Sequence, residues 1–170
     1  MYPWFSSLLI FASTNCRVTV SVSFILRLLV FPLNSSTNSQ PCSFISGYRS
    51  YALVLSENHV YTSGAGGTNA AAIRGALRAE RPDLLTVILP QSFAKQSRES
   101  QDLLKGVTDL VTMPQNDNLS LDLASRICNS RLLGETDQLI AFAFHDSTTV
   151  IEATNEAKSL DMLVTVLYLD

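Results

Sequence analysis

The sequence predicts a Rossmann-like, three-layer α/β domain with a mainly parallel sheet. Two strand-length runs, "LLTVILP" at residues 84–90 and "QLIAFAF" at residues 138–144, are almost continuously apolar. Such runs are expected of strands buried on both faces. Segments with helical spacing alternate with the strand-like runs over short joints, and parallel strands need crossovers of this kind. The length of 170 residues suits a single domain.

Residues 1–47 differ from the rest in composition. There is no Asp or Glu before Glu57, and Ser and Thr are frequent, which is typical of organelle transit peptides. The most apolar piece, residues 18–33, is shorter than the roughly 20 residues that cross a bilayer and contains Arg27. We therefore expect no stable membrane span. We interpret residues 1–47 as a targeting segment or an altered first strand-helix unit, and residues 48–170 as the domain proper.

The three cysteines, Cys16, Cys42 and Cys128, are widely spaced and have no Cys-x-x-Cys or nearby His pattern. Neither a disulfide framework nor a metal site is predicted from them. A reducing compartment is therefore expected, either the chloroplast or another reducing intracellular compartment.

From residue 48 the elements follow in order. "YRSYALVLSE" at residues 48–57 predicts a short helix, and "HVYTSG" predicts a β-branched and aromatic strand. The segment from Asn69 to Glu80 is rich in strong helix formers, and Pro82 ends it. The remaining predicted elements are a strand at 84–90, a helix at 100–104, a strand at 110–114, a helix at 119–133, a strand at 138–144, a helix at 145–160 and a strand at 162–170.

The helix predicted at residues 119–133 has one apolar side. Leu121, Ala124, Cys128 and Leu132 recur at helical spacing, and Ser120 precedes them as a candidate N-cap. We expect this side to pack on the sheet.

Three glycines, Gly64, Gly66 and Gly67, lie between a predicted strand end and a helix start. Backbone without side chains can approach a phosphate closely, and the first-turn N–H groups of a helix favour negative charge. Thr68 would add a hydroxyl group, and Asn69 a cap or a polar contact. The alternative is a tight strand-to-helix joint without a ligand.

The glycine spacing excludes two common cofactor sites. Asn69 stands where G-x-G-x-x-G needs its third glycine, and the Walker lysine is lacking. Neither an ordinary NAD site nor a P-loop is indicated, and we expect no cofactor.

Arg74, Arg78 and Arg81 share one face of the helix that follows the loop. Spaced in this way, they could bind phosphates along a nucleic-acid backbone. A solvated helix face is the alternative, and the net charge of -3 argues against strong general affinity for nucleic acid. Three further basic residues extend the candidate patch: Lys95, Arg98 and Lys105.

The segment "FHDS" follows a predicted buried strand, at the edge of the sheet where ligands bind. His145 could contact a phosphate or transfer a proton, and Asp146 or Ser147 could contact a ribose. Alternatively, Asp146 or Ser147 caps the next helix. Because no nucleophile or paired-carboxylate constellation accompanies them, we predict no catalytic residue.

The segment "YTSGAGGTNAAAIRGALRA" resembles the glycine-loop segment of the DNA-processing protein A (Smf/DprA) family, with a specific match at "AAAIRGAL", Ala70 to Leu77. Later stretches, such as "RPDLLTVILPQS" and "SRICNSRLL", resemble the plant and cyanobacterial proteins described as DNA recombination-mediator protein A. The resemblance covers about residues 48–170 and implies the same Rossmann-like domain.

In the bacterial family this domain binds single-stranded DNA and dimerises, so the resemblance implies single-stranded DNA or a nucleotide as ligand, and a homodimer. Asn69 stands where the bacterial motif usually has Asp, and the accessory domains of full-length members are lacking, which puts DNA loading in doubt. Carried over by position, the resemblance points to a loop and helix start that meet phosphate: Ser63, Gly64, Gly66, Gly67, Thr68, Asn69 and Arg74.

The same superfamily includes the LONELY GUY-type phosphoribohydrolases, whose loop reads "PGGxGTxxE". "GAGGTNAA" is similar to it, but Ala71 stands where the motif has its Glu. Nucleoside monophosphate hydrolysis and nucleotide sensing are therefore the alternatives to a non-catalytic binding domain.

The start of the chain departs most from these relatives. Residues 6–16 are assigned to the first strand and its loop, with Ala12 near a usual glycine. Residues 18–47 fit no core element in this interpretation.

Overall fold

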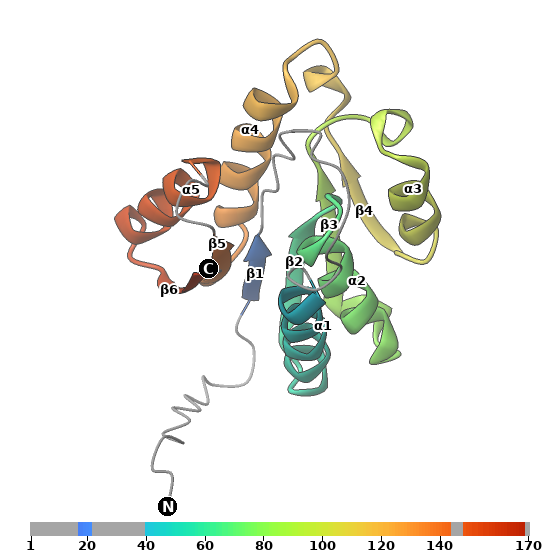
Figure 1. Ribbon diagram of the computed structural model, residues 1–170, viewed down its shortest axis with the longest axis vertical. Coiled ribbons are helices and arrows are strands. Elements are labelled where there is room, and N and C mark those ends of the chain that lie inside the picture. Colours follow the sequence, from blue (N-terminus) through green and yellow to red (C-terminus); the bar gives the residue numbers. More distant parts are fainter. Residues whose placement is uncertain (1–16, 22–39, 144–147, 169–170) are drawn as a thin grey trace, which may run out of the picture.

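The computed structural model describes residues 17–21, 40–143 and 148–168 (Figure 1). They form a six-stranded sheet in the order β4-β3-β2-β1-β5-β6, and every neighbouring pair is parallel. The predicted Rossmann-like α/β class is therefore confirmed. The strands are β1 (Arg17–Ser21), β2 (His59–Ser63), β3 (Leu85–Leu89), β4 (Asp109–Thr112), β5 (Gln138–Ala143) and β6 (Leu163–Tyr168).

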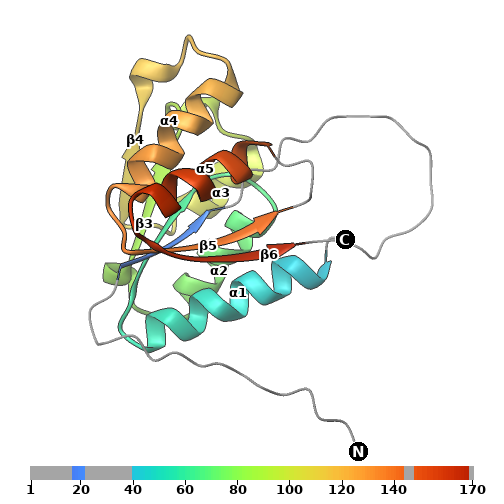
Figure 2. The ribbon, with the colours of Figure 1, turned by 90° about the vertical axis from the view of Figure 1, so that its left-hand side faces the viewer.

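Helices cover both faces of the sheet. Figure 2 shows the sheet edge-on, with α1 and α2 on one face and α4 and α5 on the other. None of the helices in the described ranges is both long and apolar enough to cross a membrane. The helices are α1 (Gln40–Leu55), α2 (Thr68–Arg78), α3 (Arg98–Leu104), α4 (Leu121–Leu133) and α5 (Thr148–Ser159), with single 3-10 turns at Pro82–Leu84, Phe93–Lys95 and Pro114–Asn116.

The core lies on both sides of the sheet. All five residues of β3 are buried, as its apolar run predicted. Leu85, Val87 and Leu89 pack with α1 and α2 residues such as Val54, while Ile88 belongs to the cluster on the α4 side. This two-sided burial follows because helices cover both faces of the sheet. It determines the position of the C-terminal end of β3.

Helix α4 packs on the sheet largely as predicted. Ala124, Cys128 and Leu132 are buried, and the Ser120 hydroxyl accepts a hydrogen bond from the backbone N–H of Leu123, which confirms the N-cap. Leu121 does not belong to this buried side, because its side chain is 62% exposed. It is the first residue of the helix, where α4 contributes to the rim of a cleft instead of covering the strands.

The N-terminal part contributes more to the fold than the sequence indicated. Strand β1 pairs with both β2 and β5, so it lies inside the sheet. Four of its five residues fall within residues 18–47, where no core element is predicted, and α1 begins before residue 48. The β-branched run of β1 favours a strand, and β2 and β5 provide its partners. The residues first assigned to this strand, 6–16, lie outside the described ranges.

Candidate phosphate-binding cleft

A cleft of about 270 Å³ opens at the carboxyl ends of β2 and β3. In parallel α/β sheets, ligands bind at this edge. The end of β2 and the glycine loop form one wall, the loop after β3 and the start of α3 form another, and α4 closes the cleft. The lining residues are Ser63, Gly64, Ala65, Gly66, Pro90, Gln91, Lys95, Gln96, Ser97, Ser100, Leu121, Ser125, Cys128 and Asn129.

The three glycines of the loop have different roles. Gly67 is the N-cap of α2 with a φ of 65°, a conformation that favours glycine. A Cβ atom on Gly66 or Gly67 would meet no atom within 4 Å, so the space beside them is open. A Cβ on Gly64 would lie 2.1 Å from Cδ2 of Leu89, so this glycine permits close packing.

Helix α2 starts with no side-chain hydrogen bond at its N-cap, because Gly67 has no side chain. The first N–H groups of a helix have no acceptor within the helix itself. Together with the helix dipole, they make this end of α2 suitable for an anion.

Thr68 and Asn69 face inward. Both are buried. The amide Nδ2 of Asn69 donates to Oγ of Ser63 at 2.7 Å, and Oγ of Ser46 donates to the carbonyl oxygen of Thr68 at 2.9 Å. Thr68 and Asn69 therefore hold the glycine loop against α1 and β2, and neither residue lines the cleft.

A hydrogen-bond network fixes the opposite wall. Nε2 of Gln91 donates to the carbonyl oxygens of Asn116 and Leu119, both at 3.2 Å. The carboxylate of Asp117 accepts the backbone N–H of Ser92 at 2.7 Å. This bond and a second one from the Ser92 side chain lower the pKa of Asp117. The loop after β3 is therefore held from the far side of the cleft.

The cleft favours negative charge. Among the described residues that line it, Lys95 alone is charged, and most of the others offer hydroxyl, amide or glycine backbone groups. Cys128 donates its thiol to the carbonyl oxygen of Ile88 at 3.2 Å, and burial raises its pKa to about 12. The thiol is thus neutral at ordinary pH and is a poor nucleophile. Within the described ranges, no group of three His, Cys, Asp or Glu side chains could hold a metal ion.

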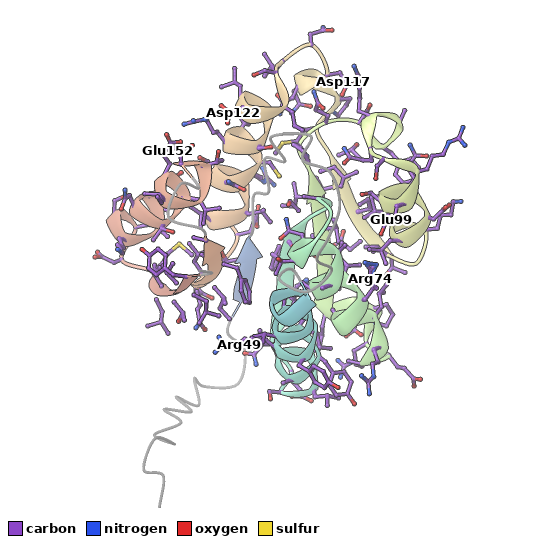
Figure 3. All side chains as sticks on the ribbon, viewed as in Figure 1. Arg49, Arg74, Glu99, Asp117, Asp122 and Glu152 are labelled. Atoms are coloured by element: carbon purple, nitrogen blue, oxygen red, sulfur yellow. The ribbon has the colours of Figure 1, made fainter. Side chains whose placement is uncertain are left out.

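The arginines predicted to accompany the loop lie elsewhere. Arg74 and Arg78 line a groove between α1 and α2 and are not among the residues of the cleft. Arg74 lies 3.8 Å from the carboxylate of Glu99, and Figure 3 shows where the two residues lie on α2 and α3. Arg81 lies beyond the end of α2 and forms two hydrogen bonds with Asp83. The expected continuous face of three arginines is therefore wrong, because the helix ends at Arg78 and the chain turns at Glu80, whose φ is 57°.

Of the other basic residues predicted to extend the patch, one lines the cleft and two do not. Lys95 lines the cleft, whereas Lys105 pairs with Asp102 outside it. Arg98 is exposed on α3 and lines neither the cleft nor the groove between α1 and α2. His145, Asp146 and Ser147 lie outside the described residues.

Several residues of the cleft were not predicted from the sequence. Gln91, Ser97 and Ser100 lie in or beside the polar stretch that follows the buried run of β3, and this abrupt change of composition was a usable signal. Ser125 and Asn129 come from α4, far along the chain, and only the packing of α4 across β2 and β3 brings them there.

No family model matches the chain, and no curated protein matches its sequence. Solved structures do match it. DNA processing protein A from Helicobacter pylori, which binds single-stranded DNA, superposes with a TM-score of 0.64 at 11% identity over 89% of this chain. TM1055, a structural genomics target, has a TM-score of 0.55 at 17% identity over 89% of this chain and 72% of its own.

DNA processing protein A from Streptococcus pneumoniae matches with a TM-score of 0.55 at 15% identity, again over 89% of this chain. The chain spans 65% of the length of the H. pylori protein and 50% of that of the S. pneumoniae protein. At these identities the likeness shows the fold, which is that of DNA processing protein A.

Proposed function

We propose that this chain is a non-catalytic binding domain of the DNA recombination-mediator type, which holds a phosphate group of single-stranded DNA or of a nucleotide in the cleft. The observation that carries the proposal is the lining of the cleft: open glycine backbone, hydroxyl and amide groups, and Lys95, with no carboxylate among the described lining residues. The fold shared with a protein that binds single-stranded DNA supports the same ligand class.

Two features of the lining, and the start of α2 beside it, favour an anion in the cleft. The uncapped start of α2 offers N–H groups and a positive dipole end. The open space beside Gly66 allows a phosphate oxygen to approach the backbone. Lys95 adds a full positive charge from the opposite wall. Bound between these groups, a phosphate would replace water with charge-assisted hydrogen bonds.

The size of the cleft limits what it can hold. A volume of about 270 Å³ lies just below the usual range of small-molecule sites, which is about 300 to 1,000 Å³. We infer that it accepts one nucleotide unit at a time, with any further strand outside. Hydrolysis finds no support in these residues, because Ala71 stands at the position of the motif glutamate and lines the groove between α1 and α2 instead of the cleft.

Fluorescence anisotropy with a labelled single strand of about 16 nucleotides tests the proposal over a series of salt concentrations. We expect Lys95→Gln to weaken binding and to reduce the salt slope by about 0.7, the value for one phosphate contact on a single strand. Lys105→Gln is the matched control, because that lysine pairs with Asp102 outside the cleft. No binding by the unaltered chain at low salt would overturn the proposal.

Competition separates the two ligands. A nucleoside monophosphate that displaces the labelled strand identifies a nucleotide-sized site, whereas a strand that resists such competition is held by more than one contact. Incubation with nucleoside monophosphates, followed by detection of free base, tests the hydrolase alternative.

We further propose, from the resemblance, that the protein is a homodimer in the chloroplast or another reducing compartment. Light scattering after size-exclusion chromatography tests the first statement, and imaging of a fluorescent fusion in plant cells tests the second.

A further inference from the structure

A second hollow, the α1–α2 groove, lies between these two helices and has a volume of about 310 Å³. It is lined by Gly47, Tyr48 and Tyr51 of α1 and by Ala71, Arg74, Gly75 and Arg78 of α2. None of these residues lines the glycine-loop cleft. The groove is therefore a separate feature of the surface.

Close contact of the two helices forms the floor of the groove. A Cβ on Gly75 would lie 2.0 Å from the carbonyl oxygen of Gly47, so only a glycine at residue 75 allows this approach. With no side chains at the crossing, the larger residues on either side become walls around a floor of backbone.

The α1 wall of the groove is aromatic, and the α2 wall is basic. Tyr48 and Tyr51 are three residues apart on α1, and Arg74 and Arg78 are four residues apart on α2, so each pair lies on one face of its helix. Tyr48 is 51% exposed. The guanidinium carbon of Arg78 lies 5.1 Å from the centre of the Tyr51 ring, a cation–π contact that orients both side chains.

The groove has a positive charge that local ion pairing does little to offset. No carboxylate is among its described lining residues. The pair between Arg74 and Glu99 spans 3.8 Å, and its side chains are 54% and 85% exposed, so solvent screens it and an incoming anion can replace it. Arg78 contacts an aromatic ring and forms no ion pair that the structure shows among the described residues. An anionic ligand is therefore the complementary one.

We propose that the α1–α2 groove binds single-stranded nucleic acid, with a base stacked on Tyr48 and neighbouring phosphates bound by Arg74 and Arg78. Aromatic rings beside basic groups are the usual means of binding single strands, since every base has a face that stacks. An acidic peptide would use the arginines but gain little from the rings. Because the groove and the cleft share no residue, this proposal does not depend on the function proposed for the cleft.

Anisotropy with the same labelled strand and the full chain tests the groove. Tyr48→Ala is expected to weaken binding about tenfold, and Tyr48→Phe to retain it, because the phenylalanine ring still stacks. Arg78→Gln is expected to reduce the salt slope by about 0.7. Arg49→Gln is the matched control, since this exposed arginine of α1 does not line the groove and lies on the side of α1 away from Arg74 (Figure 3).

Cross-linking provides a positive readout. A strand that carries bromodeoxyuridine, irradiated with the unaltered protein, is expected to become attached to the peptide that contains Tyr48 and Tyr51, as mass spectrometry would show.

Two results would overturn the proposal. In the first, Lys95→Gln weakens binding while Tyr48→Ala and Arg78→Gln leave both affinity and salt slope unchanged; the cleft would then bind the strand without the groove. In the second, the same groove variants change the oligomeric state but not binding, and the groove is an interface between protein chains. Conversely, loss of binding in the groove variants alone, with Lys95→Gln unaffected, supports the groove and contradicts the function proposed for the cleft.

Discussion

Gly75 of α2 faces the backbone of Gly47 of α1 so closely that a Cβ on Gly75 would lie 2.0 Å from the Gly47 carbonyl oxygen. Gly75 belongs to "AAAIRGAL", the segment that carries the specific resemblance to DNA-processing protein A, although no local pattern in the sequence indicates a role for it. The structure shows that it lets two helices meet, and this contact sets the depth of the α1–α2 groove.

Gly75→Ala should therefore destabilise the protein. The added methyl group meets backbone atoms that cannot rotate away, so α1 must move from α2, at a cost of about 3 kcal/mol in the free energy of unfolding. Urea denaturation followed by circular dichroism measures it.

Two other glycines, Gly47 and Gly106, serve as controls for this steric effect. Gly47→Ala should cost less, because its Cβ would lie 3.3 Å from the carbonyl oxygen of Ala71, and Gly106→Ala should cost least, because its nearest neighbour is at 3.5 Å. Equal effects of Gly75→Ala and Gly106→Ala would contradict the proposed steric cause.

Asn69→Ala should destabilise the glycine loop. The substitution removes the hydrogen bond to Oγ of Ser63 in a buried site, which typically costs about 1 to 3 kcal/mol. Since Ser63 lines the cleft, ligand affinity should also fall. Denaturation midpoints measure the first effect, with Asn155→Ala on the exposed side of α5 as control. A stability loss no larger than that of the control would show that the bond contributes little.

Cys128 should be unreactive in the folded protein. Burial raises its pKa to about 12, so almost no thiolate exists at pH 8. In a variant with Cys16→Ser and Cys42→Ser, a thiol reagent such as DTNB should react slowly in native buffer and fully in denaturant. Rapid reaction of the native protein would mean that the α4 packing opens readily.

Acid should loosen the wall of the cleft that Asp117 holds. Hydrogen bonds from Ser92 lower the pKa of Asp117, so its stabilising effect is present above the unfolded value of about 3.9 and is lost as the pH falls through the lower folded value. The amide signal of Ser92 in NMR spectra should follow this titration, with a midpoint below 3.9. Asp117→Asn, which does not titrate, should abolish the pH dependence, and a midpoint at or above 3.9 would contradict the assignment.

Local patterns in the sequence were sufficient for the class of the fold. Apolar runs indicated β3 and β5, helical spacing indicated α2 and α4, and their alternation indicated parallel strands, because a parallel sheet requires a crossover between neighbours. The glycine loop was likewise visible as a strand-to-helix joint, and Ser63, Gly64 and Gly66 do line a cleft at the predicted edge. These features depend on residues close together in the chain.

Only the tertiary structure decided how those residues are used. Asn69 turns inward because Ser63, six residues earlier, is its hydrogen-bond partner across the loop. Arg74 and Arg78 line another groove because α1 packs against α2 at two glycines. Strand β1 lies inside the sheet because β2 and β5 flank it, and its own short β-branched run does not indicate which strands it pairs with. Each outcome depends on partners that are distant in the sequence or on the direction in which a side chain points. The composition and the periodicity of the sequence give no information on either.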